Sequence, residues 1–260
     1  MIADAYEAFL FDLDGVLYRG ADPVPGAAES LTRLRSLGKG IAFVTNNSGR
    51  TPERVAERLR SVGVDADAGE VETSALTTAA VLAERGIGRA FVVGEVGVVD
   101  ALSEAGVEVA TGEPDTVDAV VVGWDRNADY TKLRVASVLV QRGARLVATN
   151  PDASFPAADG TKWPGAGALL AAIETTTGVR GEVIGKPYAP LLLAAHARAG
   201  GGRPLLIGDR LDTDIAGAAG LGWDSLLVLT GISGARDLEG SPVRPTYVAD
   251  DLRGLFAEGS

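Results

Sequence analysis

Short runs of apolar, often β-branched residues recur along the chain and alternate with segments whose apolar positions have helical spacing. The runs predict buried strands at residues 8–13, 40–44, 90–93, 118–122, 145–148, 204–207 and 225–229. Helical spacing predicts helices that include residues 25–37, 130–142, 167–177 and 188–199. Strands that are apolar at every position are typical of a parallel sheet covered on both faces, and strand–helix alternation is typical of an α/β fold. We therefore expect ligands to bind beyond the carboxyl ends of the strands.

The composition is that of a globular chain with an acidic balance. Of the 260 residues, 46% are hydrophobic and 23% are charged, and the net charge is −11. These values exclude an intrinsically disordered chain and argue against a nonspecific grip on nucleic acid or anionic lipid. No apolar run approaches the ~18 residues of a membrane span, residues 1–7 show no secretory signal, and the absence of cysteine excludes disulfides and thiolate sites. We expect a cytoplasmic protein without nucleic-acid or membrane partners.

Two carboxylates follow the first predicted strand, in Phe11-Asp12-Leu13-Asp14-Gly15. Residues two apart on a strand point to the same face, so these side chains are expected to converge. Paired carboxylates repel each other unless a cation or a shared proton intervenes, and they are oxygen ligands of the kind that Mg²⁺ prefers. Taken alone, the motif also describes a helix-capping aspartate beside a surface aspartate.

Other predicted strand ends also carry polar groups. Thr45 and Asn46 follow the second strand, in a segment that suits either an anion or the cap of the next helix. Lys186, one of only four lysines, follows a later strand, where its ammonium suits a phosphate or is a solvated loop charge. Asp209 and Asp214 follow the next strand, where acids bind a metal or cap a helix.

Together the motifs place Asp, Thr, Lys and Asp, in this order, at four strand ends. This order resembles the haloacid dehalogenase superfamily of phosphohydrolases. The finer pattern is similar to its NagD-like, 4-nitrophenylphosphatase branch, which carries a type IIA cap. The segments that carry this finer resemblance are residues 44–48, 148–152, 164–167 and 208–215. The resemblance extends over nearly the whole chain, and it is specific because four separate motifs share one order.

The resemblance implies a doubly wound, parallel-sheet, Rossmann-like α/β core with an inserted α/β cap domain. The two motif residues Thr45 and Lys186 are 141 positions apart, far more than the ~30 residues of one α/β unit. We place the cap at residues 83–178, which leaves a discontinuous catalytic core of residues 1–82 and 179–260. Residues 43–47 resemble residues 146–150, which fits either two convergent strand ends or two domains of related build.

The resemblance also implies a Mg²⁺-dependent phosphatase that works through an aspartyl-phosphate. Asp12 would be the nucleophile and Asp14 the general acid and base. The phosphoryl group would be bound by Thr45, Asn46 and Lys186. The metal site would be formed by Asp12, the backbone carbonyl of Asp14, and Asp209. Asp214 would act from behind these ligands or through a water, and direct binding by Asp214 stays open.

Substrate selection is expected to reside in the cap. The candidate residues there are Trp124, Asp125, Asn150, Asp152 and Phe155. The two aromatic residues are equally compatible with the cap core or a dimer interface, and a homodimer is expected only because relatives form one. The resemblance implies small phosphorylated metabolites as substrates, of the 2-phosphoglycolate or glycerol 3-phosphate type, and 4-nitrophenyl phosphate in vitro.

Two alternatives come from other functional classes. A phosphorylated receiver module also combines acids, a threonine and a lysine around Mg²⁺, but such modules are much shorter and lack the long gap between threonine and lysine. A non-catalytic phosphometabolite-binding protein on the same fold is the second alternative. All four motif positions are intact, which favours the enzyme, and sustained turnover separates it from both.

Overall fold

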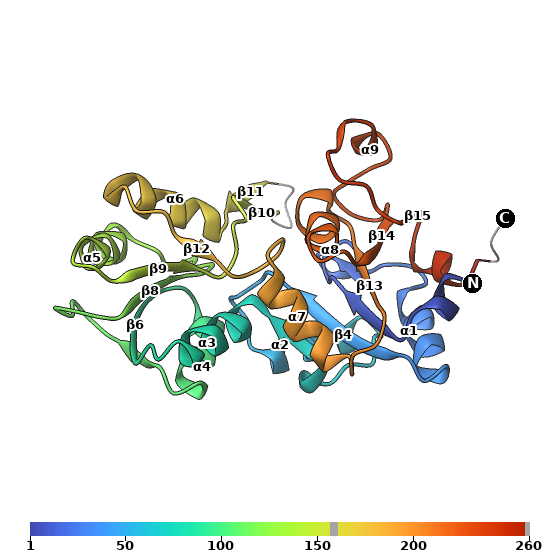
Figure 1. Cartoon of the computed structure of the whole chain (residues 1–260), viewed down its shortest axis with the longest axis horizontal. Helices are drawn as coiled ribbons and strands as arrows, with labels where there is room; N and C mark the ends of the chain where they lie inside the picture. The colour runs from blue at the N-terminus through green and yellow to red at the C-terminus, as the bar shows by residue number, and fades with distance from the viewer. Residues whose placement is uncertain (157–160, 258–260) are drawn as a thin grey trace. The chain divides into compact units, whose positions relative to one another are not determined.

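The computed structural model describes residues 1–156 and 161–257, which form two compact units (Figure 1). The first, here the core unit, comprises Met1–Thr45, Pro52–Glu72 and Lys186–Ser260. The second, here the inserted unit, comprises Asn46–Thr51 and Thr73–Gly185. Each unit is an α/β fold with its own parallel sheet.

The core unit is built on a six-stranded sheet in the order β15-β14-β13-β1-β4-β5. The strands are β1 (Ala8–Phe11), β4 (Gly40–Thr45), β5 (Val71–Thr73), β13 (Pro204–Gly208), β14 (Asp224–Val228) and β15 (Tyr247–Ala249). Strand β1 pairs in parallel with β13 and with β4, so that Phe11 lies opposite Ile207 and Phe43. Strand β13 also pairs in parallel with β14. The carboxyl ends of these strands therefore lie along one edge of the sheet.

Both faces of the core sheet are covered, which explains why its strands are apolar at successive positions. Phe9 and Phe11 lie in one hydrophobic cluster, and Ala8 and Leu10 lie in another. The first cluster includes side chains of α1 (Ala27–Ser36) and α2 (Pro52–Ser61), and the second includes side chains of α7 (Ala189–Arg198) and α8 (Ala216–Gly220). Because alternate residues of a strand face opposite sides, this is a doubly wound sheet.

The inserted unit repeats this architecture with five strands in the order β12-β9-β8-β6-β7, and all four pairings are parallel. Its strands are β6 (Arg89–Val93), β7 (Glu108–Ala110), β8 (Ala119–Val122), β9 (Arg145–Ala148) and β12 (Glu182–Val183). Its helices are α3 (Ser74–Glu84), α4 (Val96–Glu104), α5 (Tyr130–Gln141) and α6 (Ala166–Thr177). Helices α3 and α4 cover one face, and α5 and α6 cover the other (Figure 1).

Short elements complete the fold. They are the antiparallel pairs β2 (Tyr18–Arg19) with β3 (Asp22–Pro23) and β10 (Ser154–Pro156) with β11 (Lys162–Pro164), helix α9 (Asp237–Gly240), 3₁₀ turns at Ile2–Ala5, Ala68–Glu70 and Leu252–Phe256, and a π-helical turn at Leu211–Ile215. Most of these elements were not predicted, because two to five residues show no period. None of the helices in the described residues is long and apolar enough to cross a membrane.

The boundaries of the inserted unit differ from the interval expected for a cap, residues 83–178. The unit begins earlier, at Thr73, because helix α3 buries Ala75, Ala79 and Leu82 in the same cluster as α4 and the strands of the five-stranded sheet. It also ends later, at Gly185, and it includes Asn46–Thr51. The chain therefore passes between the units four times, after Thr45, Thr51, Glu72 and Gly185.

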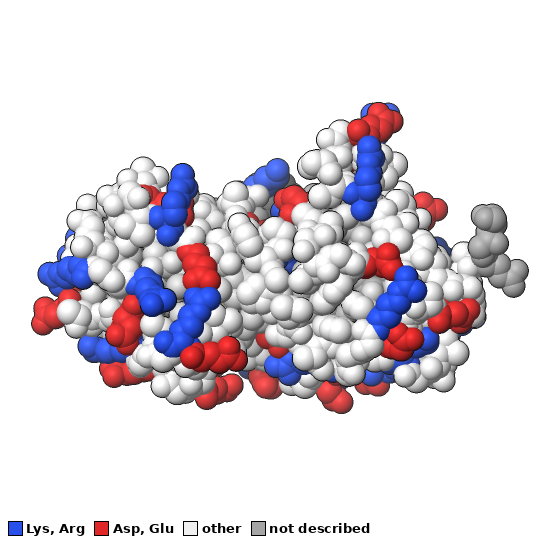
Figure 2. Space-filling model, viewed as in Figure 1, with Lys and Arg blue, Asp and Glu red and all other residues white. Residues whose placement is uncertain are grey.

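Acidic and basic side chains are interspersed on the molecular face seen in Figure 2. Several exposed charges form ion pairs, among them Arg85 with Glu182 and Arg54 with Glu57. Exposed pairs of this kind contribute about 0–1 kcal/mol each to stability.

Candidate active site

Three neighbouring strands of the core sheet end in polar residues. Strand β1 ends at Phe11 and is followed by Asp12; β4 ends with Thr45; β13 is followed by Asp209. Since β13, β1 and β4 are adjacent and parallel, these residues lie at the same edge of the sheet. This is the edge at which open α/β sheets bind ligands.

Lys186 joins two of the predicted carboxylates. Its Nζ lies 2.5 Å from Oδ1 of Asp12 and 2.7 Å from Oδ1 of Asp214. The Lys186 side chain is 3% exposed, and that of Asp214 is fully buried. A buried ammonium needs partners of opposite charge, and these two carboxylates provide them.

Asp12, Asp209 and Asp214 form a group of carboxylates whose potential ligand oxygens lie within 4.8 Å of one another. Asp209 is 2% exposed, and its Oδ1 is a buried oxygen with no hydrogen-bond partner among the described residues. A buried acceptor without a partner costs free energy, and a cation would satisfy it. Clustered carboxylate oxygens are the ligands that suit Mg²⁺, so the residues fit that ion.

Burial and mutual repulsion shape the protonation of this group. Burial raises the pKa of Asp12 well above its usual value, although the ammonium of Lys186 acts to lower it. The negative charges of Asp214 and Asp209 raise it further. Burial, followed by the charge of Asp214, raises the pKa of Asp209 to about 7. Burial alone would lower the pKa of Lys186, but the carboxylates of Asp12 and Asp214 outweigh it and raise that pKa. The single ammonium of Lys186 therefore does not balance the charges of the three carboxylates of Asp12, Asp209 and Asp214.

Asp14 is placed by a tight turn rather than by a strand. Strand β1 ends three residues earlier, and Gly15 adopts a φ of +82°, which favours glycine. The backbone N–H of Gly15 donates to the carbonyl of Tyr18 at 2.8 Å, which closes the turn. The Asp14 side chain is exposed, and it is not a member of the carboxylate group found among the described residues.

Asp214 lies on the π-helical turn Leu211–Ile215 instead of at a regular helix start. Its Oδ2 accepts a hydrogen bond from the backbone N–H of Arg210 at 3.2 Å. A Cβ atom at position 208 would lie 2.3 Å from the Asp214 side chain, so only glycine permits this approach. Gly208 therefore allows the segment that carries Asp214 to fold back onto the end of β13.

Two of the predicted selectivity residues form an aromatic pair in the inserted unit. The ring centroids of Trp124 and Phe155 are 4.6 Å apart, in a stacked arrangement. The guanidinium of Arg126 lies 5.1 Å from the Trp124 ring centroid and also pairs with Glu95 at 2.6 Å. The backbone N–H of Trp124 donates to Oγ of Ser48. The pair is thus held from several sides.

A second group joins Asn46, Asn150 and Asp152. The Asn150 amide donates to the Asn46 carbonyl at 2.6 Å, and the Asn46 amide donates to Oδ2 of Asp152 at 3.2 Å. The backbone N–H of Asp152 donates to Oδ1 of Asn150. The two similar sequence segments around Asn46 and Asn150 therefore meet in the inserted unit, a contact that no sequence period indicates.

The buried carboxylate of Asp125 is bound by neighbouring residues of the inserted unit. Its side chain is 1% exposed, its Oδ2 lies 2.6 Å from Nζ of Lys132, and its Oδ1 accepts from the backbone N–H of Asn127. Both oxygens are therefore engaged within the inserted unit. Sequence reasoning did not connect Lys132 with this carboxylate.

The chain matches models of haloacid dehalogenase-like hydrolases over residues 9–108 and 183–255. It is 39% identical to the acid sugar phosphatase of Staphylococcus aureus strain USA300, over 97% of this chain and 98% of that protein. This chain belongs to the haloacid dehalogenase-like hydrolase family.

Solved structures of haloacid dehalogenase-like hydrolases agree with this assignment. The glycerol phosphate phosphatase of Mycobacterium tuberculosis in complex with magnesium has a TM-score of 0.92 and 37% identity, over 98% of this chain and 77% of that chain. NagD from Escherichia coli K-12 has a TM-score of 0.88 and 32% identity, over 95% of this chain and 96% of that chain. The predicted superfamily and its NagD-like branch are confirmed, as is an α/β fold with parallel sheets.

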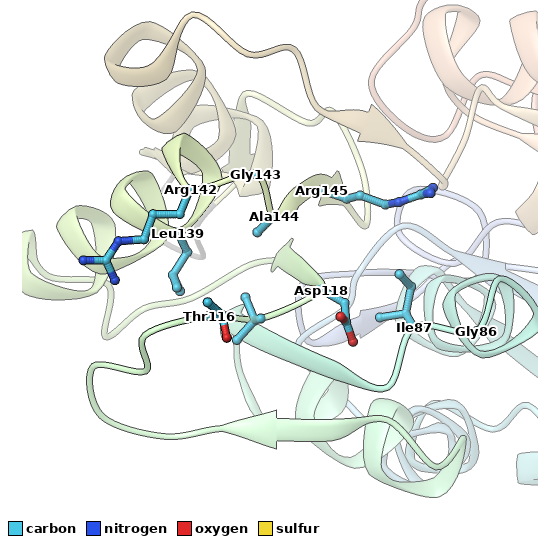
Figure 3. Close-up of a pocket in the computed structure, with 10 residues that line it drawn as sticks. Gly86, Ile87, Thr116, Asp118, Leu139, Arg142, Gly143, Ala144 and Arg145 are labelled. Carbon is cyan, nitrogen blue, oxygen red and sulfur yellow. The ribbon is translucent and has the colours of Figure 1, made fainter.

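The inserted unit of this haloacid dehalogenase-like hydrolase also contains a pocket of about 300 Å³ (Figure 3). Its lining includes Ile87, Asp118 and Ala144 at the amino-terminal ends of β6, β8 and β9. In Figure 3 the guanidinium groups of Arg142 and Arg145 point to opposite sides of it, so they do not converge on an anion. The pocket is at the opposite end of these strands from Trp124 and Asn150.

Proposed function

We propose that this chain is a Mg²⁺-dependent phosphatase that hydrolyses small phosphomonoesters through an aspartyl-phosphate on Asp12. The observation that carries the proposal is the pairing of Lys186 with Asp12 and Asp214 near Asp209, whose Oδ1 has no hydrogen-bond partner within residues 1–156 and 161–257. The residues proposed as the nucleophile, the phosphate-binding cation and a metal ligand thus lie close together at the carboxyl edge of a doubly wound sheet. Membership in the hydrolase family and the phosphatase names of its relatives support the same reaction class.

In this proposal, an oxygen of Asp12 attacks phosphorus as the bond to the leaving oxygen breaks. Thr45 and Lys186 bind the other phosphoryl oxygens, where negative charge accumulates in the transition state. Thr45 is 5% exposed at the end of β4, and Lys186 is 2% exposed. Rigid, poorly hydrated donors of this kind need little reorganisation during the reaction.

Asp14 is assigned the proton transfers. Its carboxyl group protonates the leaving alkoxide and then takes a proton from the water that hydrolyses the aspartyl-phosphate. The exposure of its side chain supports this role, because an acid that serves both the leaving group and water needs access to solvent. Asn46 is assigned to orient the phosphoryl group or Asp12, although the inserted unit also engages its side chain with Asp152.

Asp12, the backbone carbonyl of Asp14 and Asp209 would hold Mg²⁺, with Asp214 acting directly or through water. The bound ion would supply positive charge that offsets the repulsion between a carboxylate and a phosphate dianion. The raised pKa values of Asp12 and Asp209 fit this assignment, because they reflect a site that lacks positive charge.

The inserted unit is proposed to act as the cap that selects the substrate. Trp124, Phe155, Asn150 and Asp152 offer an aromatic pair and a polar group near the carboxyl ends of β8 and β9. Two of the four passages of the chain between the units adjoin Thr45 and Lys186, which bind phosphate in the proposal. Asp125 is the weakest of the five candidates, because Lys132 and Asn127 occupy its carboxylate.

The proposed substrates are small metabolites such as glycerol 3-phosphate or 2-phosphoglycolate. The relatives include an acid sugar phosphatase and a glycerol phosphate phosphatase, whose names refer to small phosphorylated sugars and glycerol phosphate. A homodimer and a cytoplasmic location stay predictions.

The test is phosphate release from a panel of phosphomonoesters with Mg²⁺, including 4-nitrophenyl phosphate, with Asp12→Asn as the control. The proposal expects turnover by the wild type and none by Asp12→Asn or in EDTA. Asp14→Asn should lower turnover steeply while it retains Mg²⁺ binding. Mg²⁺ binding without turnover on any substrate would favour the alternative of a non-catalytic phosphometabolite-binding protein.

A further inference from the structure

The loop of residues 230–233 lies at the same edge of the core sheet as the carboxylate group. It follows β14, which pairs in parallel with β13, the strand that leads into Asp209. Its sequence is Thr230-Gly231-Ile232-Ser233, and none of its residues was singled out from the sequence. We refer to it as the 230–233 loop.

The 230–233 loop forms hydrogen bonds to both the side chain and the backbone of Asp209. The N–H of Ile232 donates to Oδ2 of Asp209 at 2.7 Å, and the N–H of Ser233 donates to the Asp209 carbonyl at 3.0 Å. The buried hydroxyl oxygen of Ser233 accepts from the backbone N–H of Leu211 at 3.1 Å, just beyond Asp209. One carboxylate oxygen is therefore occupied by the loop, and Oδ1 is the oxygen left without a partner among the described residues.

The same loop is tied to the turn that carries Asp12 and Asp14. The hydroxyl of Thr230 donates to the carbonyl of Gly15 at 2.5 Å. Gly15 directly follows Asp14, whose backbone carbonyl is assigned to the metal. One loop thus contacts both chain segments that supply the proposed metal ligands.

Steric contacts also fix the Asp209 side chain. A Cβ atom on Gly231 would lie 1.9 Å from Oδ2 of Asp209, and a Cβ atom on Gly15 would lie 2.4 Å from it. The carboxylate therefore lies against the backbone of Gly15 and of Gly231, and a side chain at either position would collide with it. A carboxylate held in this way has little freedom to turn its second oxygen.

We propose that Thr230 and Ser233 are positioning residues for the Mg²⁺ site. Thr230 holds the turn after β1 against the loop, and Ser233 holds the backbone after Asp209. Together they keep Oδ1 of Asp209 available to the cation. The inference rests on the proposed function only in taking Mg²⁺ as the bound ion, and it concerns affinity for that ion rather than a catalytic step.

The test compares Thr230→Val with Thr230→Ser. Valine has nearly the shape of threonine but no hydroxyl, whereas serine restores the donor. Isothermal titration of the metal-free proteins with Mg²⁺ should show a dissociation constant about tenfold or more higher for Thr230→Val, since partners that orient a metal ligand typically contribute 10–100-fold in affinity. Thr230→Ser should bind like the wild type, and Thr230→Val should recover most of its kcat at saturating Mg²⁺.

Thr32→Val is the matched control. The hydroxyl of Thr32 donates to the carbonyl of Ala28 at 2.9 Å in helix α1, so the substitution removes a similar hydrogen bond elsewhere in the same unit. Its melting temperature in EDTA can fall like that of Thr230→Val, but its Mg²⁺ affinity should not change. This separates a positioning role from a loss of general stability.

Ser233→Ala supplies a second, independent variant, and it should also weaken Mg²⁺ binding. If both Thr230→Val and Ser233→Ala bind Mg²⁺ within twofold of the wild type, the inference is wrong. If Thr230→Val does not fold, Ser233→Ala decides alone by the same criterion. Wild-type Mg²⁺ binding that depends on both hydroxyls, without phosphatase turnover, would uphold the inference and overturn the proposed function.

Discussion

Substitution of Lys186 by Met removes the charge that links Asp12 to Asp214 while keeping a side chain of similar length. At an effective dielectric constant of ~20, each ammonium–carboxylate contact of 2.5 and 2.7 Å is worth on the order of 6 kcal/mol before desolvation. Taking the ions out of water offsets much of this. Removal of one partner from a buried pair then costs about 3–5 kcal/mol. In EDTA, the variant should therefore melt about 10 °C lower, at ~2–4 °C per kcal/mol.

The effects on metal and on turnover should have opposite signs. The wild-type group of Asp12, Asp209, Asp214 and Lys186 carries three formal negative charges and one positive charge. Without the ammonium, Mg²⁺ meets a more negative site, so the variant should bind Mg²⁺ more tightly at pH 8.5 and regain much of its melting temperature. Turnover should still fall about 10²–10³-fold, the usual loss when a transition-state donor is removed.

The assay measures Mg²⁺ affinity by calorimetry, melting temperature with EDTA or Mg²⁺, and phosphate release from 4-nitrophenyl phosphate. Lys39→Met is the control, because it removes an ammonium elsewhere in the core unit. The Lys39 ammonium donates to the Tyr6 carbonyl at 2.7 Å. This variant should leave Mg²⁺ affinity and turnover unchanged. Weaker Mg²⁺ binding by Lys186→Met, or turnover within tenfold of the wild type, would refute the charge-balance reasoning.

Three further predictions follow from buried or stacked groups. Because burial raises the pKa of Asp209 to about 7 from an unfolded value near 4, the metal-free protein should lose stability as pH rises through this range. Saturating Mg²⁺ or Asp209→Asn should reduce this loss in thermal melts, and an Asp209→Asn variant that loses as much stability as the wild type over the same pH range would contradict the prediction. In urea denaturation, Lys132→Met should destabilise the inserted unit by about 3 kcal/mol, because it strands the carboxylate of Asp125. The double variant with Asp125→Leu should recover most of that loss; failure to recover would show that the pair is not the cause. Trp124→Ala, which removes the stack on Phe155, should change the ranking of substrates by KM, and an unchanged ranking would argue against selection by this pair.

Much of the architecture could be predicted from local patterns. The apolar runs correspond to β1, β4, β6, β8, β9, β13 and β14, because strands covered on both faces need apolar residues at successive positions. The same reasoning placed the candidate site residues at the carboxyl ends of β1, β4 and β13. Boundaries were less accurate, since the strand predicted at residues 8–13 ends at Phe11 and places Asp12 and Asp14 in a turn.

The residue types at the strand ends were also available from the sequence, together with the family that they resemble. Their order along the chain indicated a cation and a phosphate before any geometry was known. Short elements such as β5 and β10 were not predicted, because they have too few residues for a period and are stabilised by neighbours distant in sequence.

The sequence by itself therefore determined the type of fold, the sheet edge that carries the candidate site and the residue types available there. Only the tertiary structure decided which side chains meet: Lys186 with Asp12, 174 residues apart, Asn46 with Asn150, and Thr230 with Gly15. The physical reason is that backbone periodicity depends on neighbours within a few residues. Partners of buried charges and hydroxyls depend instead on which strands and loops become adjacent when the sheets form.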